Sequence, residues 1–162
     1  MKTWLQCLAY VIVFCEICLV CGCHRNIEEV KIENSTAQQT LLIGLIEGRS
    51  SDFKEAIIQG LVERYAPTCA ITVLNVKNVE QVAQAAYTAL VIIDRNEMGM
   101  EHNDTVKAII EQVNPNSLVV FVTSGAPWNY HGVDAMTSAS EKGKEQAILQ
   151  QIAAKIDAIF KQ

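Results

Sequence analysis

A short, hydroxyl-rich segment near the carboxyl end of the chain holds the residues best suited to covalent chemistry. Residues 132–140 read GVDAMTSAS and place Asp134, Thr137, Ser138 and Ser140 among small residues. A hydroxyl with small neighbours is accessible to an enzyme, and a helix start behind it favours the negative charge of a phosphate. The segment is therefore a candidate site for the covalent attachment of a group.

The same segment also fits the start of a helix. Ser138 and Glu141 stand at the spacing of a capping box, in which Ser138 is the N-cap and the Glu141 side chain reaches back to it. Thr137 and Asp134 then belong to the preceding turn, and no cofactor is involved. The sequence leaves both interpretations open.

Other candidate catalytic groups are isolated. His102 and His131 have no Cys or His partner at metal-ligand spacing, so the sequence predicts no metal site. No acid–base pair is recognisable, and Asp94 is expected with the acidic residues after it in a solvated loop. Cys69 falls in an expected buried strand, where a free cysteine behaves as a small apolar residue.

Residues 1–23 form a segment of their own, with Lys2 near the start and an apolar stretch from Leu5 to Gly22. This layout is typical of a secretory signal or a membrane anchor. It ends in VCGC, which resembles a bacterial lipobox and implies that Cys23 becomes the lipid-modified first residue of the mature chain. We therefore expect an exported protein, anchored through its N-terminus on the extracytoplasmic side of the membrane or free in the periplasm.

The remaining residues divide into a tether and one domain. Residues 24–39 are polar, without a sustained period, and are expected to be a tether. Residues 40–162 are long enough for a single domain with its own core. The net charge of −5, without a cluster of Lys or Arg, argues against a nucleic-acid-binding surface.

Short apolar runs alternate with amphipathic segments throughout the domain. The expected strands are 40–46, 69–76, 89–94 and 117–123, with an optional short strand at 133–137. The expected helices are 51–65, 78–87, 104–113 and a last helix from near Glu141 to 160. This alternation predicts an α/β fold, with helices on both faces of a four- or five-stranded parallel sheet in the order 2-1-3-4 and any fifth strand at the edge.

In such sheets, ligands bind at the carboxyl ends of the strands. The loops expected there are 47–51, 94–103 and 124–140, and with them the chain resembles the flavodoxin-like proteins over residues 40–160. The resemblance implies a three-layer sandwich that binds FMN, with Trp128 and Tyr130 placed to flank the flavin ring. Arg49 and the backbone N–H groups at the first helix start are the groups that can meet a phosphate.

Residues 134–140 resemble the attachment motif of exported flavoproteins, with Ser138 at a position that is usually glycine. In that class, a flavin transferase joins FMN through its phosphate to the last hydroxyl of the motif, which here is Ser140. The resemblance implies that Asp134, Thr137 and Ala139 shape the segment for the transferase. It also implies an electron carrier that serves a redox partner protein, with the flavin rather than the protein performing the chemistry.

Two other interpretations keep the fold and omit the flavin. The stretch from 41 to 65 also resembles one lobe of exported solute-binding proteins, although such proteins close two lobes on a ligand. The chain is alternatively a cofactor-free lipoprotein of flavodoxin-like fold that acts as an interaction module.

Overall fold

The computed structural model describes residues 27–46, 51–96, 103–127 and 130–162. The expected leader, 1–23, lies outside the described residues. So do three of the predicted site residues, namely Cys23, Arg49 and Trp128.

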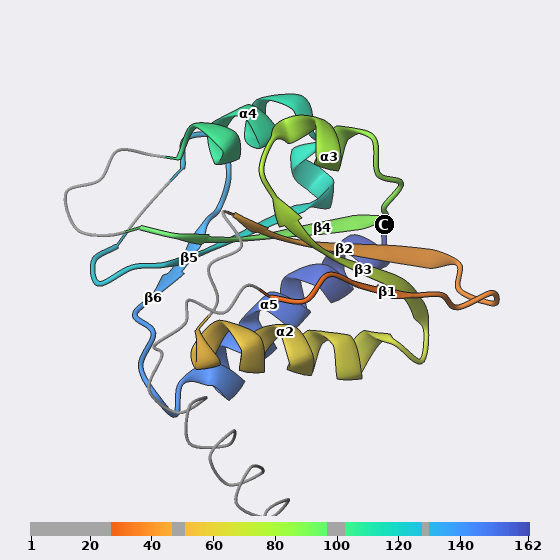
Figure 1. Cartoon of the computed structure of the whole chain (residues 1–162), viewed down its shortest axis with the longest axis horizontal. Coiled ribbons are helices and arrows are strands. Elements are labelled where there is room, and N and C mark those ends of the chain that lie inside the picture. Colours follow the sequence, from red (N-terminus) through yellow and green to blue (C-terminus); the bar gives the residue numbers. More distant parts are fainter. Residues whose placement is uncertain (1–26, 47–50, 97–102, 128–129) are drawn as a thin grey trace, which may run out of the picture.

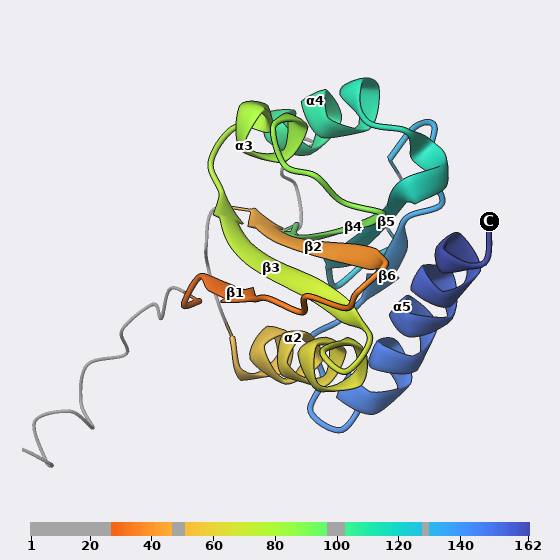
Figure 2. The same ribbon diagram turned by 90° about the vertical axis from the view of Figure 1, so that its right-hand side faces the viewer.

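The described chain alternates strands and helices (Figure 1). The elements are β1 Val30–Ile32, β2 Gln39–Ile46, α2 Asp52–Tyr65, β3 Cys69–Val76, α3 Val79–Ala83, β4 Ala89–Arg95, α4 Asp104–Gln112, the 3-10 helix η1 Pro115–Ser117, β5 Leu118–Thr123, β6 Met136–Ser138 and α5 Glu145–Phe160. Helices α2 and α5 cover one face of the sheet, whereas α3 and α4 cover the other (Figures 1 and 2). The protein is thus a three-layer α/β sandwich, as predicted.

The sheet has six strands in the order β1-β3-β2-β4-β5-β6. Strands β2 to β6 pair in parallel, with Gly44 of β2 beside Leu74 of β3 and Ile92 of β4. Numbered among themselves, these parallel strands run 2-1-3-4-5, which is the flavodoxin-like order. The prediction of 2-1-3-4 with a short fifth strand at the edge is confirmed.

Strand β1 was not predicted. It lies within the segment expected to be a tether and pairs antiparallel with β3, placing Val30 opposite Val73 and Ile32 opposite Ile71. Ile32 and Ile27 pack against the core on the α2/α5 face. A few scattered apolar side chains in a polar segment are a weak signal, so the sequence period did not reveal this strand.

The central strands are continuous apolar runs because both of their faces are buried. Along β2, Leu41, Ile43 and Leu45 belong to the core under α2 and α5. Leu42 and Ile46 belong to a second core, under α3 and α4. This alternation of neighbouring residues between two cores fixes the register of β2 in the sheet.

Side-chain caps begin the first helices where the sequence predicts. The Ser51 hydroxyl accepts from the Lys54 N–H at 3.3 Å, and the Asn103 side chain accepts from the Thr105 N–H at 2.9 Å. Helix α3 is shorter than the predicted 78–87, although Asn78 and Gln81 form a complete capping box at its start.

The last helix begins later than predicted, so the capping-box interpretation is wrong. Ser138 is the last residue of β6, and its carbonyl accepts from the Ser124 N–H at 3.0 Å. A turn that includes Gly143 at φ +93° separates Glu141 from α5, which starts at Glu145. A positive φ is incompatible with a right-handed helix, so the helix cannot extend back to Glu141.

Tyr65 joins α2 to α5 through polar contacts on the side of the core. Its hydroxyl donates to Asp157 Oδ1 at 2.6 Å and lies 3.0 Å from the Ala153 carbonyl oxygen. Arg64 Nη2 contacts Asp157 Oδ2 at 2.8 Å. Burial raises the pKa of Asp157, but the hydrogen bonds from Tyr65 and Arg64 outweigh it and hold the pKa below its usual value.

The lowered pKa of Asp157 predicts a loss of stability in acid. A carboxyl whose pKa is lower in the folded than in the unfolded chain stabilises the fold above its unfolded pKa, about 3.9, and loses that contribution as the pH falls through the folded pKa. The stability of wild type should therefore fall more between pH 7 and pH 3 than that of Asp157→Asn. Thermal unfolding across this range measures the difference, and parallel curves for the two proteins would contradict it.

Candidate functional site

Polar residues gather at the carboxyl ends of β4 and β5, the edge at which such sheets bind ligands. We call Asp94, Asn96, Thr123, Ser124 and Tyr130 the carboxyl-edge cluster. All of them are buried, Asp94 being 2% exposed and Asn96 7% exposed. Buried polar side chains are costly unless they are hydrogen-bonded, so this concentration is a distinctive feature of the fold.

Hydrogen bonds tie the ends of β4, β5 and β6 together within this cluster. The Thr123 hydroxyl donates to the Asp94 carbonyl at 3.1 Å, and the Asn96 N–H donates to the Thr123 carbonyl at 3.0 Å. The Ser124 hydroxyl accepts from the Ala126 N–H at 3.2 Å. The loop that leaves β5 is therefore fixed against the end of β4.

Tyr130 lies inside the core rather than on the surface. It is 3% exposed and belongs to the core under α3 and α4, and its hydroxyl donates to Asp94 Oδ2 at 2.7 Å. The sequence placed Tyr130 beside a flavin ring, and that role stays a prediction. The structure gives the side chain an additional role, which is to satisfy a buried carboxylate.

Asp94 was expected in a solvated loop, and this expectation is wrong. It belongs to β4 and is buried on the α3/α4 side with Tyr130. Lys54, in the first turn of α2, is also buried and was not singled out from the sequence. Asp94 is the first charged residue at the end of an apolar run, and this position is the signal that could have placed it in the strand.

One polar atom of the cluster has no partner within the described part of the chain. Asn96 Oδ1 is buried and accepts no hydrogen bond there. An unmade buried hydrogen bond costs about 1–3 kcal/mol, so such an atom favours a ligand that donates to it. Asn75 Oδ1 is in the same condition, but its side chain faces the N-terminal segment, where Asn75 Nδ2 donates to the Ile27 carbonyl at 2.8 Å.

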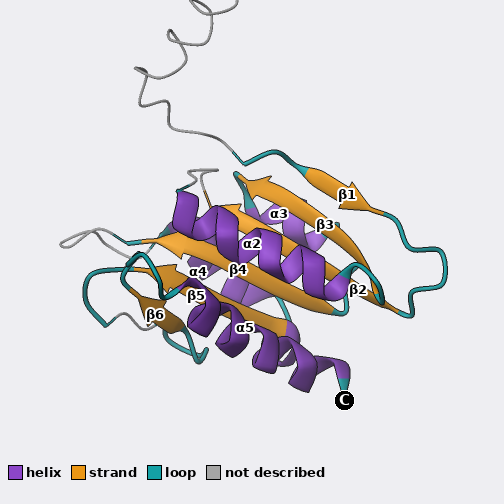
Figure 3. Cartoon of the chain, turned by 90° about the horizontal axis from the view of Figure 1, so that it is seen from below, coloured by secondary structure: helices purple, strands orange, loops and turns teal. Residues whose placement is uncertain are grey.

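The candidate attachment segment follows the β6 edge of the sheet, where β6 pairs only with β5 among the described strands (Figure 3). Thr137 lies in β6 opposite Val122 of β5, and Ala139 is half-buried just beyond the strand. Asp134 precedes β6 and forms an ion pair with Lys155 of α5. Ser140 is exposed beyond the carboxyl end of β6.

The turn after Ser140 leads to a helix start without a side-chain cap. Lys144 is the N-cap of α5 but makes no capping hydrogen bond from its side chain. Its Nζ contacts Glu141 Oε2 at 2.6 Å, while Glu145 Oε2 accepts from the Gly143 N–H at 2.7 Å. The first N–H groups of α5 thus follow Ser140 closely in the chain, a placement that favours a negatively charged group.

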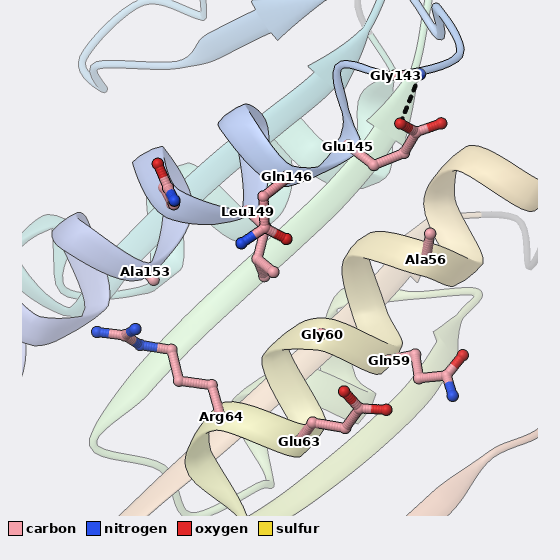
Figure 4. Close-up of a pocket in the computed structure, with 11 residues that line it drawn as sticks. Ala56, Gln59, Gly60, Glu63, Arg64, Gly143, Glu145, Gln146, Leu149 and Ala153 are labelled. Carbon is pink, nitrogen blue, oxygen red and sulfur yellow. Dashed lines mark hydrogen bonds between the residues drawn. The ribbon is translucent and has the colours of Figure 1, made fainter.

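A separate groove of about 770 Å³ lies between α2 and α5 (Figure 4). A Cβ on Gly60 would lie 2.5 Å from Leu149 Cδ2, so the glycine permits the two helices to pack closely. Glu63, Arg64 and Glu145 are among the polar residues around it. Of the predicted site residues that the structure describes, none lines this groove.

Within the described ranges, no group of three or more His, Cys, Asp or Glu side chains could hold a metal ion. Nor is any helix in those ranges long and apolar enough to cross a membrane.

Comparisons with known proteins support the fold only. No protein-family model matches the sequence, and no similar sequence was found among curated proteins. The structure is similar to part of the lysine decarboxylase LdcF of Francisella novicida, with a TM-score of 0.50 and 11% identity over 79% of this chain. The matched region spans 18% of the decarboxylase. A second similar structure is oxidised flavodoxin 2 of Bacillus cereus, with a TM-score of 0.41 and 12% identity, covering 75% of this chain and 98% of that one. The similarity is one of fold alone.

Proposed function

We propose that this chain is an exported FMN-binding electron carrier, with the flavin phosphate esterified to Ser140. The observation that carries the proposal is the exposure of Ser140 beyond the carboxyl end of β6, next to the edge at which flavodoxin-like sheets bind ligands. Ser138 and Glu141 do not cap the last helix, because α5 begins at Glu145.

The chemistry requires an accessible hydroxyl and an activated phosphate. With FAD as the donor, the Ser140 Oγ–P bond forms, a P–O bond of the pyrophosphate breaks and AMP leaves, while the hydroxyl proton passes to a base of the transferase. The flavin, once bound, supplies the one- or two-electron chemistry. The protein positions the ring and excludes water from it.

Polar groups near the carboxyl ends of the strands support the binding of a flavin. Asn96 Oδ1 is a buried acceptor without a partner among the described residues, and a flavin ring offers N–H donors. The start of α5 favours the phosphate charge near Ser140. Trp128 and Tyr130 are the aromatic residues proposed to shield the ring, and Arg49 is the cation proposed to meet the phosphate.

Coexpression with a flavin transferase tests the proposal. The purified protein should be yellow, should keep its flavin after denaturation and should gain the mass of one FMN. A protein that stays colourless under these conditions would favour the cofactor-free interaction module.

Export and anchoring form a separate part of the proposal. The apolar leader and the VCGC sequence support a lipid on Cys23, a membrane-held N-terminus and a domain outside the cytoplasm, where it meets a redox partner protein. Cys23→Ala should abolish lipid incorporation, as measured by intact mass, while the domain keeps its fold. Finding the full-length wild-type chain in the cytosol would contradict export.

A further inference from the structure

Two buried polar side chains at the carboxyl edge of the sheet keep hydrogen-bonding capacity for a ligand. Asn96 is 7% exposed, and its Oδ1 atom accepts no hydrogen bond within the described part of the chain. Ser124 is 8% exposed, and its hydroxyl oxygen accepts from the Ala126 N–H at 3.2 Å, which leaves the hydroxyl hydrogen to donate. An acceptor and a donor are therefore both buried at this edge.

The sheet places these two side chains next to each other. Arg95 of β4 pairs with Thr123 of β5, and the Asn96 N–H donates to the Thr123 carbonyl at 3.0 Å. In a parallel ladder this bond makes Asn96 and Ser124 the next pair, with their main chains about 5 Å apart and their side chains on the same face of the sheet. Side chains two residues apart share a face, so both continue the α3/α4 face that carries Asp94.

An acceptor beside a donor matches a ligand group that offers a donor beside an acceptor. A lactam edge, in which an N–H stands next to a C=O in a planar ring, has this pattern. Its N–H would donate to Asn96 Oδ1, and its C=O would accept from the Ser124 hydroxyl. Because a buried acceptor without a hydrogen bond is unfavourable, a ligand that donates to Asn96 Oδ1 removes this cost when it binds.

The charge at this point of the edge favours a neutral group over an anion. Asp94, which is 2% exposed, lies two residues before Asn96 on the same face, and its carboxylate would repel a negative group. An ionised phosphate has no hydrogen to donate, so it also leaves Asn96 Oδ1 without a partner. A neutral lactam meets neither difficulty.

We propose that Asn96 and Ser124 bind the lactam edge of a planar heterocycle. The inference deepens the proposed function, on which it rests for the choice of a flavin as the first ligand, because the flavin ring carries such an edge at its N3 atom. It does not require the bond to Ser140, so the reversible binding of an unattached ligand tests it. Pyrimidine nucleosides such as uridine carry the same edge and are the second source of this chemistry.

Methylation of the ring nitrogen removes the donor from the ligand and leaves the protein unchanged. Riboflavin and 3-methylriboflavin form one matched pair, and uridine and 3-methyluridine form the other. Wild type, prepared without a flavin transferase, should bind riboflavin about tenfold or more tightly than 3-methylriboflavin, as measured by isothermal titration calorimetry. In Asn96→Leu, which has no acceptor, this preference should fall to within about twofold. Leucine is no smaller than asparagine, so a preference caused by the bulk of the methyl group would persist.

A second pair of variants tests the donor and does not depend on the folding of Asn96→Leu. Ser124→Ala removes the hydroxyl and should weaken the binding of riboflavin about threefold or more. Ser124→Thr keeps a hydroxyl and is the matched control, which should stay within about twofold of wild type. Unchanged affinity in Ser124→Ala would overturn the inference.

The outcomes distinguish the inference from the function on which it rests. If neither pair of ligands binds, or if methylation costs the same affinity in wild type and Asn96→Leu, the inference is overturned. If riboflavin and 3-methylriboflavin bind wild type equally well, flavin binding stands and the inference fails. If only the uridine pair binds with the expected preference, the inference stands and the proposed flavin function fails.

Discussion

Replacing Ser140 with alanine should abolish covalent flavin attachment. The substitution removes the oxygen that forms the phosphoester, and no other atom of that side chain can replace it. The exposure of Ser140 beyond β6 makes a collateral loss of stability small, within about 0.5 kcal/mol. Intact mass after coexpression with a flavin transferase should show one added FMN in wild type and none in Ser140→Ala.

Two neighbouring variants are the controls for this result. Ser140→Thr keeps the hydroxyl and should still accept the flavin. Ser138→Ala removes a hydroxyl that donates to the Ala139 carbonyl at 3.1 Å, and it should leave attachment at Ser140 intact. A flavin mass on Ser140→Ala would place the bond on another residue, with Thr137 and Ser138 as the next hydroxyl groups to test.

The fold could be predicted because strands that are buried on both faces of the sheet have a recognisable apolar sequence. Runs such as ALVIID are apolar at nearly every position since α3 and α4 cover one side of the strand and α2 and α5 the other. The helices predicted at 51–65 and 104–113 begin beside Ser51 and Asn103, whose hydroxyl and amide groups cap them and whose residue types are common at helix starts. These signals are local, so a single sequence is enough to detect them.

The first residue of the last helix could not be predicted, because the residue types before it fit both a helix cap and a strand followed by a turn. Ser138 and Glu141 have the types and spacing of a capping box, but Ser138 is held in β6 by its bond to Ser124. The pairing of β6 with β5 is a long-range contact, which no local pattern reveals. The glycine at 143 was a local sign that the helix starts later, because glycine readily adopts the positive φ found there.

The buried polar contacts of the candidate site also could not be predicted from the sequence. Asp94 and Tyr130 are far apart in the chain, and only the return of the loop after β5 brings the phenol hydroxyl within 2.7 Å of the carboxylate. A charged residue at the end of a strand is commonly solvated, so residue type alone favoured the wrong environment for Asp94. The environment of a polar side chain in a site is determined by tertiary contacts, whereas a buried strand can be recognised from its apolar composition.

Tyr130→Phe should destabilise the fold by about 1.5–3 kcal/mol, because it removes a hydrogen bond to a buried carboxylate. The ring is kept, so the core under α3 and α4 loses little packing. Asp94 is 2% exposed, and water cannot readily replace the missing donor at Oδ2. Chemical denaturation at pH 7 measures the change in the free energy of unfolding.

Tyr65→Phe is the matched control for this prediction. The Tyr65 hydroxyl also donates to a carboxylate, but the Asp157 side chain is 35% exposed, so water can take the place of the lost donor. The cost should be about 0.5–1.5 kcal/mol, smaller than for Tyr130→Phe. Equal costs for the two variants would mean that burial of Asp94 does not strengthen its bond to Tyr130. A flavin absorbance that changes in Tyr130→Phe, with stability unchanged, would instead assign Tyr130 to the flavin ring rather than to the support of Asp94.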